Sequence, residues 1–407
     1  MKILFLSLID FSDIDEPGIY TDLLREFDRH GHEIYVVSPR ERRVGGKTCL
    51  IKKGNVIILK LRIGNIQKTN IIEKGISTLL LEHVFIDGIK KYFNNIRFDL
   101  ILYPTPPITI YKVVQYVKKR DRANSYLLLK DIFPQNAVDL GMLSTGGIKA
   151  PLYLYFRAQE KKLYAVSDRI GCMSPANVDY LIRNNPTVDK SKVEVCPNSV
   201  DVVDKRLNTE KRLEMRKRYG LPQDKVIFVY GGNLGRPQGI DFLICCLEKA
   251  QKNHKAYFLI VGDGTEYKKL EKYIGTKQPK NVKLMKSLPK DEYDSMIAAC
   301  DVGMVFLDHR FTIPNFPSRL LSYLQSGLPV LACTDPNTDV GRIIVEGGFG
   351  WWCESDDDEK FEYYANFTCA YDLVELGERG YQYLLEHYDV RVAYKMIIHN
   401  FEEGNTK

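Results

Sequence analysis

The sequence has no hydrophobic run long enough to cross a membrane. Its longest stretch without a charged residue, residues 320–334, is shorter than the roughly 20 residues that a spanning helix needs, and it contains Gly327 and Pro329. The residues after Met1, KILFLSLID, have the character of a β-strand and not that of a secretory signal peptide. We therefore expect a chain that does not cross a membrane.

Paired cysteines and clustered histidines are also missing. None of the nine cysteines forms a C-x-x-C pair, and this odd, scattered set predicts reduced thiols in the cytosol and not a disulfide framework. The seven histidines are scattered, with no H-E-x-x-H motif and no Cys/His cluster. The sequence thus predicts no metal site.

Two common nucleotide-binding fingerprints are absent. There is no G-x-G-x-x-G turn and no P-loop, which disfavours an enzyme that uses a dinucleotide on two Rossmann halves. Zinc-finger spacing and a basic helical arm are absent too, which disfavours nucleic acid as a partner.

Acidic residues are scarce in the first half of the chain. Residues 1–200 hold 30 Lys and Arg against 21 Asp and Glu, whereas residues 201–407 hold 28 against 31. The excess lies in residues 40–130, a stretch that suits an anionic membrane surface or is simply a solvated basic face. The cations of this stretch include Arg40, Arg42, Arg43, Lys47, Lys52, Lys53, Lys60, Arg62, Lys68, Lys90, Lys91, Lys118, Lys119 and Arg120.

A helix expected at residues 70–95 leaves two interpretations open. It is broadly apolar, and lysines lie towards its ends. This composition suits a helix that lies on a membrane surface, and it equally suits a helix buried in a protein core.

Short apolar, β-branched runs alternate with helical patterns along the whole chain. This alternation predicts an α/β fold with parallel sheets covered on both faces. It occurs twice, on either side of a polar stretch at residues 201–220, so we expect two Rossmann-like halves with a ligand crevice between them at the carboxyl ends of the strands. The expected strands are residues 2–8, 33–38, 56–61, 99–103, 125–129, 168–173, 192–196, 226–231, 256–262, 281–285, 301–306 and 329–333.

Residues 313–334, IPNFPSRLLSYLQSGLPVLACT, predict an anion site. A helix begins at Ser318 and Arg319 and stops at Gly327, before an apolar strand. Unpaired N–H groups and partial positive charge at a helix N-terminus favour an anion, and an arginine there adds a bidentate phosphate contact. The alternative is an ordinary capped helix that precedes a buried strand.

Several segments follow one another in an order typical of a known family. The first half has MKILFLSL, the Pro17–Gly18 turn, HGHEIYVVSP, Lys130–Asp131–Ile132–Phe133–Pro134 and VEVCPNSVD. The second half has VIFVYGGNLGRPQGIDFLI, YFLIVGDGTEYKKL, VKLMKSLPKDEY, ACDVGMVFL, the segment 313–334 and GGFGWW. In this order the chain resembles family 4 glycosyltransferases of the GT-B fold, and within them an L-fucosamine-transferase-like subgroup that acts in bacterial O-antigen and capsule assembly.

The resemblance implies two Rossmann-like domains that face each other across a cleft. Residues 1–203 would bind the acceptor and residues 204–386 the nucleotide sugar, usually a UDP-sugar; for a C-terminal helix at 387–407, crossing back to the first domain is one option. Transfer would retain anomeric configuration and need neither metal nor cofactor. The implied catalytic residues are Asp131, Arg236 and Arg319; the implied donor-site residues are Gly18, Gly232, Asn233, Gly262, Lys286, Ser287, Asn315, Ser318, Leu320, Leu321 and Ser322; and Lys130 would contact an acceptor phosphate.

Several of these residues have structural alternatives. Gly18 and the glycines of VGDG could serve only tight β–α turns. Asp131 could be a helix cap, and Lys130 a surface charge.

The chain also departs from the family pattern. Pro314 and Ser322 stand where the family often has a pair of glutamates, and Asn233 and Gln238 stand where it has Arg and Lys. Arg236 is then the single cation of that glycine turn, so phosphate stabilisation would depend more on Arg236 and Arg319.

The most concrete expectation is a retaining glycosyltransferase with a polyprenyl-diphosphate-linked saccharide acceptor, peripheral on the inner face of a bacterial cell membrane. In a front-face substitution, the leaving diphosphate oxygen would help to deprotonate the acceptor hydroxyl. A nucleotide- or glycan-binding partner subunit with little catalysis is the alternative that the missing glutamate pair favours.

Overall fold

The computed structural model describes residues 1–66 and 71–402. The chain forms two compact units: residues 1–201 together with the segment from Val390 onward, and residues 202–389. The chain therefore passes between the units at 201/202 and again at 389/390. The expected polar connector at 201–220 is only partly one, since residues 209–218 form a helix of the second unit.

In its described residues the first unit contains one eight-stranded sheet. The strand order is β3-β4-β2-β1-β5-β6-β7-β8, and all neighbours are parallel except β3 and β4. The strands are β1 (Lys2–Leu6), β2 (Glu33–Glu41), β3 (Cys49–Lys53), β4 (Val56–Ile63), β5 (Leu100–Pro104), β6 (Asn124–Leu129), β7 (Arg169–Cys172) and β8 (Val193–Val195). The helices are α1 (Ile19–Arg29), α2 (Ile71–Tyr92), α3 (Tyr111–Asp121), α4 (Gln135–Asp139), α5 (Ala150–Val166), α6 (Pro175–Asn184) and α15 (Val390–Glu402).

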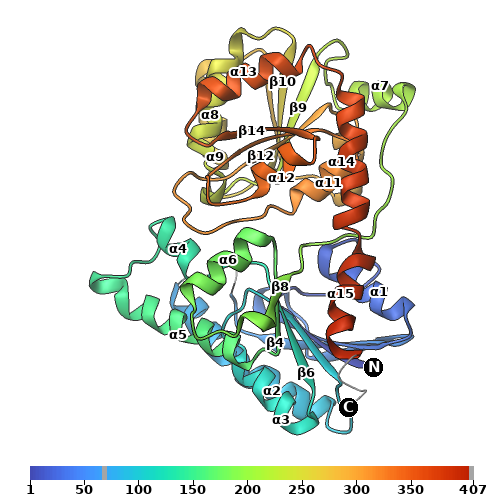
Figure 1. The fold of residues 1–407 in the computed structure, drawn as a ribbon, viewed down its shortest axis with the longest axis vertical. Coiled ribbons are helices and arrows are strands. Elements are labelled where there is room, and N and C mark those ends of the chain that lie inside the picture. The colour runs from blue at the N-terminus through green and yellow to red at the C-terminus, as the bar shows by residue number, and fades with distance from the viewer. Residues whose placement is uncertain (67–70, 403–407) are drawn as a thin grey trace. The chain divides into compact units, whose positions relative to one another are not determined.

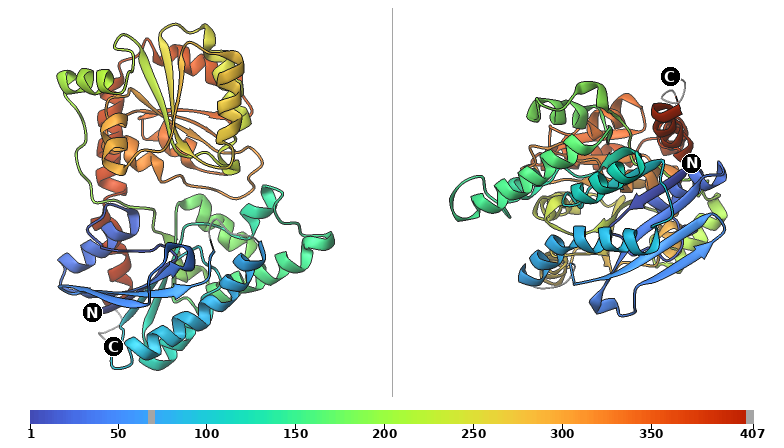
Figure 2. Two further views of the ribbon diagram at one scale, coloured as in Figure 1. Left: turned by 180° about the vertical axis from the view of Figure 1, so that it is seen from behind. Right: turned by 90° about the horizontal axis from the view of Figure 1, so that it is seen from below.

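Both faces of this sheet are buried. Successive residues of a strand point to opposite faces, so Leu4 and Leu6 of β1 pack with α2, α3 and α5, whereas Ile3 and Phe5 pack with α1 and α15. Figures 1 and 2 show these helices on the two faces of the sheet.

The second unit contains a six-stranded parallel sheet in its described residues. Its order is β11-β10-β9-β12-β13-β14, so the winding reverses between β9 and β12. The strands are β9 (Val226–Asn233), β10 (Ala256–Asp263), β11 (Val282–Met285), β12 (Val302–Phe306), β13 (Val330–Thr334) and β14 (Gly350–Glu354). The helices are α7 (Thr209–Arg218), α8 (Ile240–Lys249), α9 (Tyr267–Lys277), α10 (Lys290–Ile297), α11 (Arg319–Gln325), α12 (Val340–Glu346), α13 (Asp358–Thr368) and α14 (Leu373–His387).

The α/β prediction is confirmed, and each expected strand overlaps a real one. The two strands that the sequence did not predict, β3 and β14, each lie at one edge of their sheet; the opposite edges, β8 and β11, were predicted. An edge strand has a neighbour on one side only and is less buried, so it lacks the continuous apolar run that marks a central strand.

The basic stretch is not entirely a surface feature. Lys60 is fully buried in β4, where its ammonium group lies 2.8 Å from an Asp10 carboxylate oxygen, so it belongs to the interior of the unit. Lys68 lies outside the described residues. Phe85 and Ile89 of α2 belong to the core, while Leu79 and Leu80 are each 53% exposed, so the described part of this helix is a core helix with one apolar edge in solvent.

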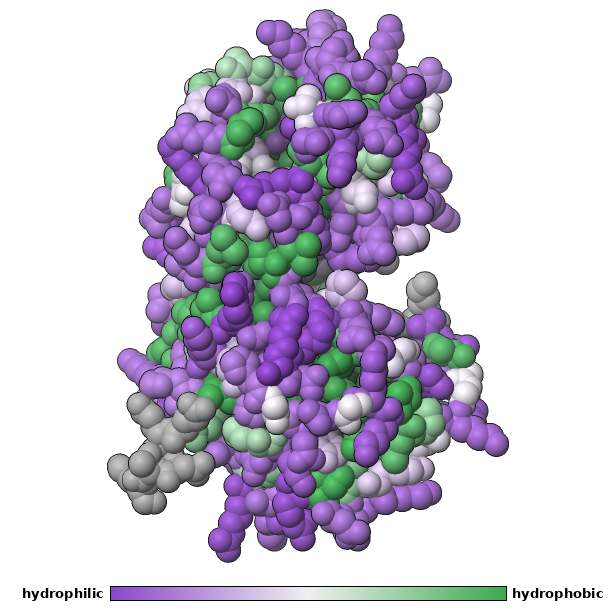
Figure 3. Space-filling model, turned by 90° about the vertical axis from the view of Figure 1, so that its right-hand side faces the viewer, coloured by the Kyte–Doolittle hydropathy of each residue, from purple (hydrophilic) through white to green (hydrophobic). Residues whose placement is uncertain are grey.

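Polar side chains dominate the molecular face in Figure 3, with smaller hydrophobic groups between them. Among the helices of the described residues, none combines the length and the apolar character that a membrane span requires.

Candidate functional site

The loops at the carboxyl ends of the second unit's strands surround a pocket of about 650 Å³. They follow β9, β10, β12 and β14, so the pocket adjoins the point where the winding of the sheet reverses, a usual place for a ligand in an α/β fold. The lining residues are Arg236, Gly239, Ile240, Asp241, Phe242, Glu266, Lys269, Asp308, His309, Arg310, Ser355 and Asp356.

The glycine turn after β9 is held tightly against the end of β10. Gly232 has φ +116°, a conformation that favours glycine, and it pairs with Gly262 of β10. A side chain on Gly262 would place its Cβ 1.9 Å from the Gly232 carbonyl oxygen. Close packing of the two turns therefore accounts for Gly262, whose role towards a nucleotide stays a prediction.

Asn233 and Gln238, the residues at the family's Arg and Lys positions, brace this turn. Asn233 Nδ2 donates to Gln238 Oε1 at 3.2 Å, and the same oxygen accepts from the Gly235 amide at 3.1 Å. Arg236 lies between them with a side chain that is 60% exposed, 3.9 Å from Glu266 at the pocket wall. Neutral side chains thus fix the loop, and Arg236 is its cation.

Arg319 lies beside the glycine turn. Its guanidinium carbon is 4.3 Å from the centre of the Tyr230 ring, and its nearest atoms are 3.9 Å from where a Cβ on Gly232 would stand. Burial lowers the pKa of Arg319, but the neighbouring Tyr230 and Tyr323 raise it by more, so the group stays charged. Its Nη1 is buried and has no hydrogen-bond partner in the part of the chain that the structure describes. A cation with a buried, unused donor atom is the site's clearest requirement for an anion.

The helix that Arg319 opens contributes less through its backbone than the sequence suggested. Helix α11 has seven residues with Ser318 as its N-cap, and the amides of Leu320 and Leu321 already donate to the carbonyls of Pro317 and Ser318. The side chains of Leu320 and Leu321 are buried in the core. An anion would therefore bind mainly to the Arg319 side chain.

A second polar cluster joins the loop that precedes α11 to the loop that follows β13. Asn315 accepts a 2.6 Å hydrogen bond from Thr338 on its carbonyl oxygen, and its Nδ2 is buried without a partner among the described residues. The Thr338 amide donates to Asp335, which is fully buried and whose Oδ2 has no partner either. Burial raises the pKa of Asp335 to about 6. Asp335 was missed from the sequence; its signal was a carboxylate directly after the apolar strand β13.

The remaining donor-side residues, like Arg319 and Asn315, are not among the residues that line the pocket. The Lys286 ammonium lies 3.3 Å from the centre of the Tyr267 ring and 3.8 Å from Asp263, and Ser287 is exposed. Ser322 is half-buried on α11, and its carbonyl accepts from Ser326. Their roles stay predictions.

In the first unit, Asp131 follows β6 with an unpaired carboxylate. Its amide and carbonyl both bond the Thr105 hydroxyl, whereas its side chain makes no hydrogen bond or ion pair within residues 1–66 and 71–402. Burial raises the pKa of Asp131 to about 6. The neighbouring Lys130 turns inwards, where its Nζ donates to the Cys196 carbonyl at 3.2 Å and burial lowers its pKa. Lys130 thus has an internal partner, so it is not the surface charge that the sequence offered as the alternative.

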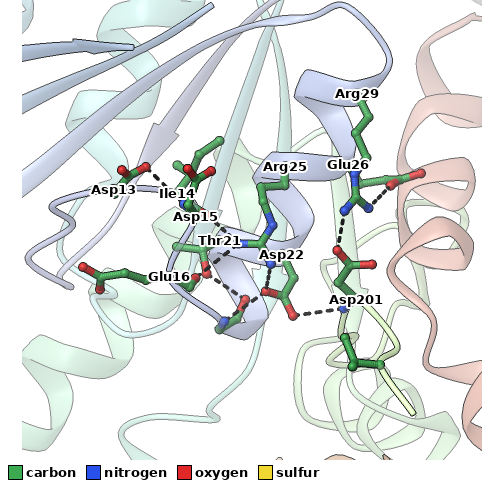
Figure 4. A network of polar contacts seen from close by, with 12 residues as sticks. Asp13, Ile14, Asp15, Glu16, Thr21, Asp22, Arg25, Glu26, Arg29 and Asp201 are labelled. Carbon is green, nitrogen blue, oxygen red and sulfur yellow. Dashed lines mark hydrogen bonds and ion pairs between the residues drawn. The ribbon is translucent and has the colours of Figure 1, made fainter. Parts of the chain in front are cut away.

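A polar network that includes Asp22, Arg25 and Asp201 lies around the start of α1 (Figure 4), and Gly18 is bonded to its Asp22. The Gly18 N–H donates to Asp22 at 3.0 Å, and Asp22 also accepts from Arg25 and, at 3.0 Å, from the Asp201 amide. Because the Gly18 N–H already has an acceptor, Gly18 would not donate it to a ligand. The absence of a side chain at Gly18 would only leave space for one. In the described residues, no group of three or more His, Cys, Asp or Glu side chains is arranged to hold a metal ion.

The class of protein follows from the fold and from a family match over the site. Residues 211–367, which carry the glycine turn, the pocket and Arg319, match the family model described as glycosyl transferases group 1. Together with relatives named as glycosyltransferases, this domain supports a transferase enzyme, as the sequence predicted.

Two relatives and two solved structures illustrate the similarity. Over 332 residues the chain is 25% identical to "Probable glycosyltransferase WbjE" of Pseudomonas aeruginosa, which covers 80% of this chain and 79% of that protein. Over 134 residues it is 32% identical to the glycosyltransferase TuaC assigned to teichuronic acid biosynthesis in Bacillus subtilis, covering 31% of this chain and 29% of that one.

Sucrose-phosphate synthase from Thermosynechococcus elongatus superposes with a TM-score of 0.74 at 14% identity, over 99% of this chain and 98% of that one. Anabaena HepE, solved with UDP and glucose, gives 0.71 at 15% identity over 99% and 100%. These structures show the GT-B fold of two Rossmann-like domains.

Proposed function

We propose that this protein transfers a sugar from a UDP-sugar to a lipid-linked saccharide in bacterial surface-polysaccharide synthesis, with retention of anomeric configuration and without a metal ion. The observation that carries the proposal is the half-buried, charged Arg319, whose buried Nη1 is unused, beside the Gly232 turn. Relatives named for colanic acid and teichuronic acid biosynthesis support the polymer class, and the UDP bound in HepE supports the donor.

The two arginines would stabilise the departing diphosphate. Negative charge develops on the leaving group as the glycosidic bond breaks, and preorganised cations stabilise that charge without reorganisation. Arg319 has a cation–π contact with Tyr230, whereas Arg236 is exposed at the pocket wall. One leaving oxygen would take the acceptor's proton in a front-face substitution.

Asn315 and Asp335 supply polar groups where the family's glutamates are missing. With Pro314 and Ser322 at those positions, the buried Nδ2 of Asn315 and Oδ2 of Asp335 are the nearby unpaired donor and acceptor. A hydroxyl of ribose or of the sugar would accept from Asn315, which is the only one of the two residues that is partly exposed, because a hydroxyl both donates and accepts.

An anionic membrane surface is the proposed location, and exposed apolar side chains support it. In addition to the cations of residues 40–130, the chain has a segment at 140–159 that contains no acidic residue and carries Lys149. Within it, Ile148 is fully exposed, and Met142, Leu152 and Leu154 are also exposed. Apolar side chains flanked by cations suit an anionic bilayer. Flotation with vesicles should therefore increase with anionic lipid content; flotation independent of that content would count against this location.

A partner subunit with little catalysis is the second candidate, favoured by Pro314 and Ser322. Incubation with a panel of nucleotide sugars and lipid-linked acceptors separates the two. We expect UDP release that depends on the acceptor, and stabilisation of the fold by UDP but not by NAD, with about 2.7 kcal/mol added at a hundredfold its dissociation constant. UDP binding without any turnover would favour the partner subunit, and no response to UDP would contradict both.

A further inference from the structure

A small pocket lies inside the first unit, and none of the catalytic, donor-side or acceptor-side residues predicted from the sequence lines it. It has a volume of about 80 Å³ and lies between the loop that follows β6, helix α5 and helix α6. Ile132 and Pro134 line it from the loop, directly after Asp131 in the chain.

The charged groups of the pocket are already paired with each other. Arg157 and the buried Glu160 form an ion pair on α5, and the Tyr164 hydroxyl donates to Glu160 at 2.7 Å. A second guanidinium nitrogen of Arg157 donates to the Asn184 carbonyl at 2.8 Å. Because these charges neutralise each other in place, the pocket favours a neutral ligand over an anion or a cation.

Neutral polar groups of the pocket are left without partners. Asn185 is 95% buried, and its Nδ2 donates to the Leu181 carbonyl at 2.9 Å, but its buried Oδ1 accepts nothing within the described residues. The hydroxyls of Tyr153 and Tyr180 likewise make no hydrogen bond there, and burial raises the pKa of Tyr180 to about 12, so this hydroxyl stays protonated. The pocket thus presents one unused acceptor and two phenol hydroxyls that can bond the hydroxyl groups of a ligand. Its aromatic rings can pack against the apolar face of a ligand ring.

The size of the pocket limits that ligand. The volume of the pocket exceeds the roughly 10–15 Å³ that one water needs and is far smaller than the 650 Å³ of the pocket in the second unit, so its size suits one sugar ring better than a nucleotide.

We propose that this pocket binds one neutral monosaccharide unit of the acceptor, held by Tyr153, Tyr180 and Asn185, and that it selects the acceptor whose next hydroxyl approaches Asp131. The assignment to an acceptor rests on the proposed function, since it takes the first unit as the acceptor side. The binding of a neutral sugar does not depend on it.

Matched variants on neighbouring helices test the pocket. Tyr180→Phe removes one pocket hydroxyl and keeps the ring, while Tyr155→Phe removes a hydroxyl from a tyrosine of α5 that does not line the pocket. We expect Tyr180→Phe to raise the acceptor KM about tenfold, with kcat and the dissociation constant of UDP within twofold, and Tyr155→Phe to change none of them. Unchanged KM in both Tyr180→Phe and Asn185→Leu, with both variants folded by thermal melting, would overturn the proposal.

Saturation-transfer NMR with free sugars gives a readout that needs no turnover. Neutral hexoses and N-acetylhexosamines should give signals that Tyr180→Phe weakens, and glucuronic acid should not. If the protein binds neutral sugars in this way but neither binds UDP nor turns over a UDP-sugar, the proposed function fails and the pocket stands. If UDP-sugars are turned over while no sugar signal depends on Tyr180, the pocket proposal fails alone.

Discussion

The Arg319 guanidinium combines a fixed position with an unused donor. Its guanidinium carbon lies 4.3 Å from the centre of the Tyr230 ring, and Nη1 is buried without a partner among the described residues. A hydrogen bond from a charged group contributes about 1.5–3 kcal/mol. Arg319→Ala should therefore weaken UDP binding by about 10- to 150-fold in calorimetry.

The matched control for this variant is Arg342→Ala, which removes an exposed arginine from α12 in the same unit. It should leave UDP affinity unchanged. Arg319→Lys keeps the charge but loses the planar pair of donors, so its affinity should fall between those of the wild type and Arg319→Ala. Equal affinity in all four proteins would contradict a phosphate contact by Arg319.

The carboxyl group of Asp131 makes stability depend on pH in a defined direction. Burial raises its pKa from 3.8 to about 6, so the folded state holds the proton more tightly than the unfolded chain does. The cost of burying the ionised group is absent below the unfolded pKa, grows between pH 4 and 6 and is complete above pH 6. This difference between the pKa of the unfolded chain and that of the folded state corresponds to a free-energy cost of about 3 kcal/mol.

Asp131→Asn should therefore stabilise the protein by at most about 3 kcal/mol at pH 7.5 and by about 1 kcal/mol at pH 4.5 in urea denaturation. Asp179→Asn, which replaces an exposed carboxylate of α6, should stay within about 0.5 kcal/mol at both pH values. The same gain from Asp131→Asn at both pH values would argue against a buried, ionised carboxylate.

The start of α1 is tied to the end of the first unit's main segment by the network of Figure 4. Asp22 is buried and accepts from the amides of Gly18 and Asp201, whereas Arg29, which pairs with Asp201, is half exposed. Asp22→Ala leaves the amides of Gly18 and Asp201 without their acceptor and removes the ion-pair partner of Arg25, so it should cost about 2–4 kcal/mol. Arg29→Ala should cost less than about 1 kcal/mol. Urea denaturation measures both; similar costs would mean that the network acts as surface charge only.

Strands with continuous apolar runs could be predicted from the sequence. Strands of mixed polarity, whose place depends on pairing with a neighbouring strand, could not. The central strands β1, β5 and β12 are buried on both faces and appear directly in the sequence, while β3 and β14 are edges with mixed polarity. The resemblance placed Arg319 at the glycine turn. It could not show that Asp335 keeps an unpaired oxygen, because that depends on which backbone amides reach the carboxylate after folding.

The two units have separate cores, but the chain links them twice. The segment that leaves the first unit and the one that returns are bonded to each other, since the Val390 amide donates to the Val200 carbonyl at 2.9 Å. From there α15 packs against α1 and the sheet, and Tyr394 stacks on His30 at 4.1 Å between ring centres. Helices α1 and α15, the first and the last in the described chain, therefore belong to the same hydrophobic core of the first unit.

Removal of residues 390–407 should therefore unfold the first unit and spare the second. The deletion takes away six buried side chains, Val390, Ala393, Tyr394, Ile397, Ile398 and Phe401. A buried large apolar side chain contributes about 1.5–3 kcal/mol, so their combined loss is comparable with the 5–15 kcal/mol that stabilises a domain. Hydrogen exchange should show lost protection in β1, α1 and β2, while β9, β12 and α11 stay protected and UDP still protects the turn at Gly232. Ile397→Ala, a milder change, should cost about 2–5 kcal/mol in the first unit only. Equal loss of protection in both units would mean that they fold as one cooperative body, and the donor site could then not be studied apart from α15.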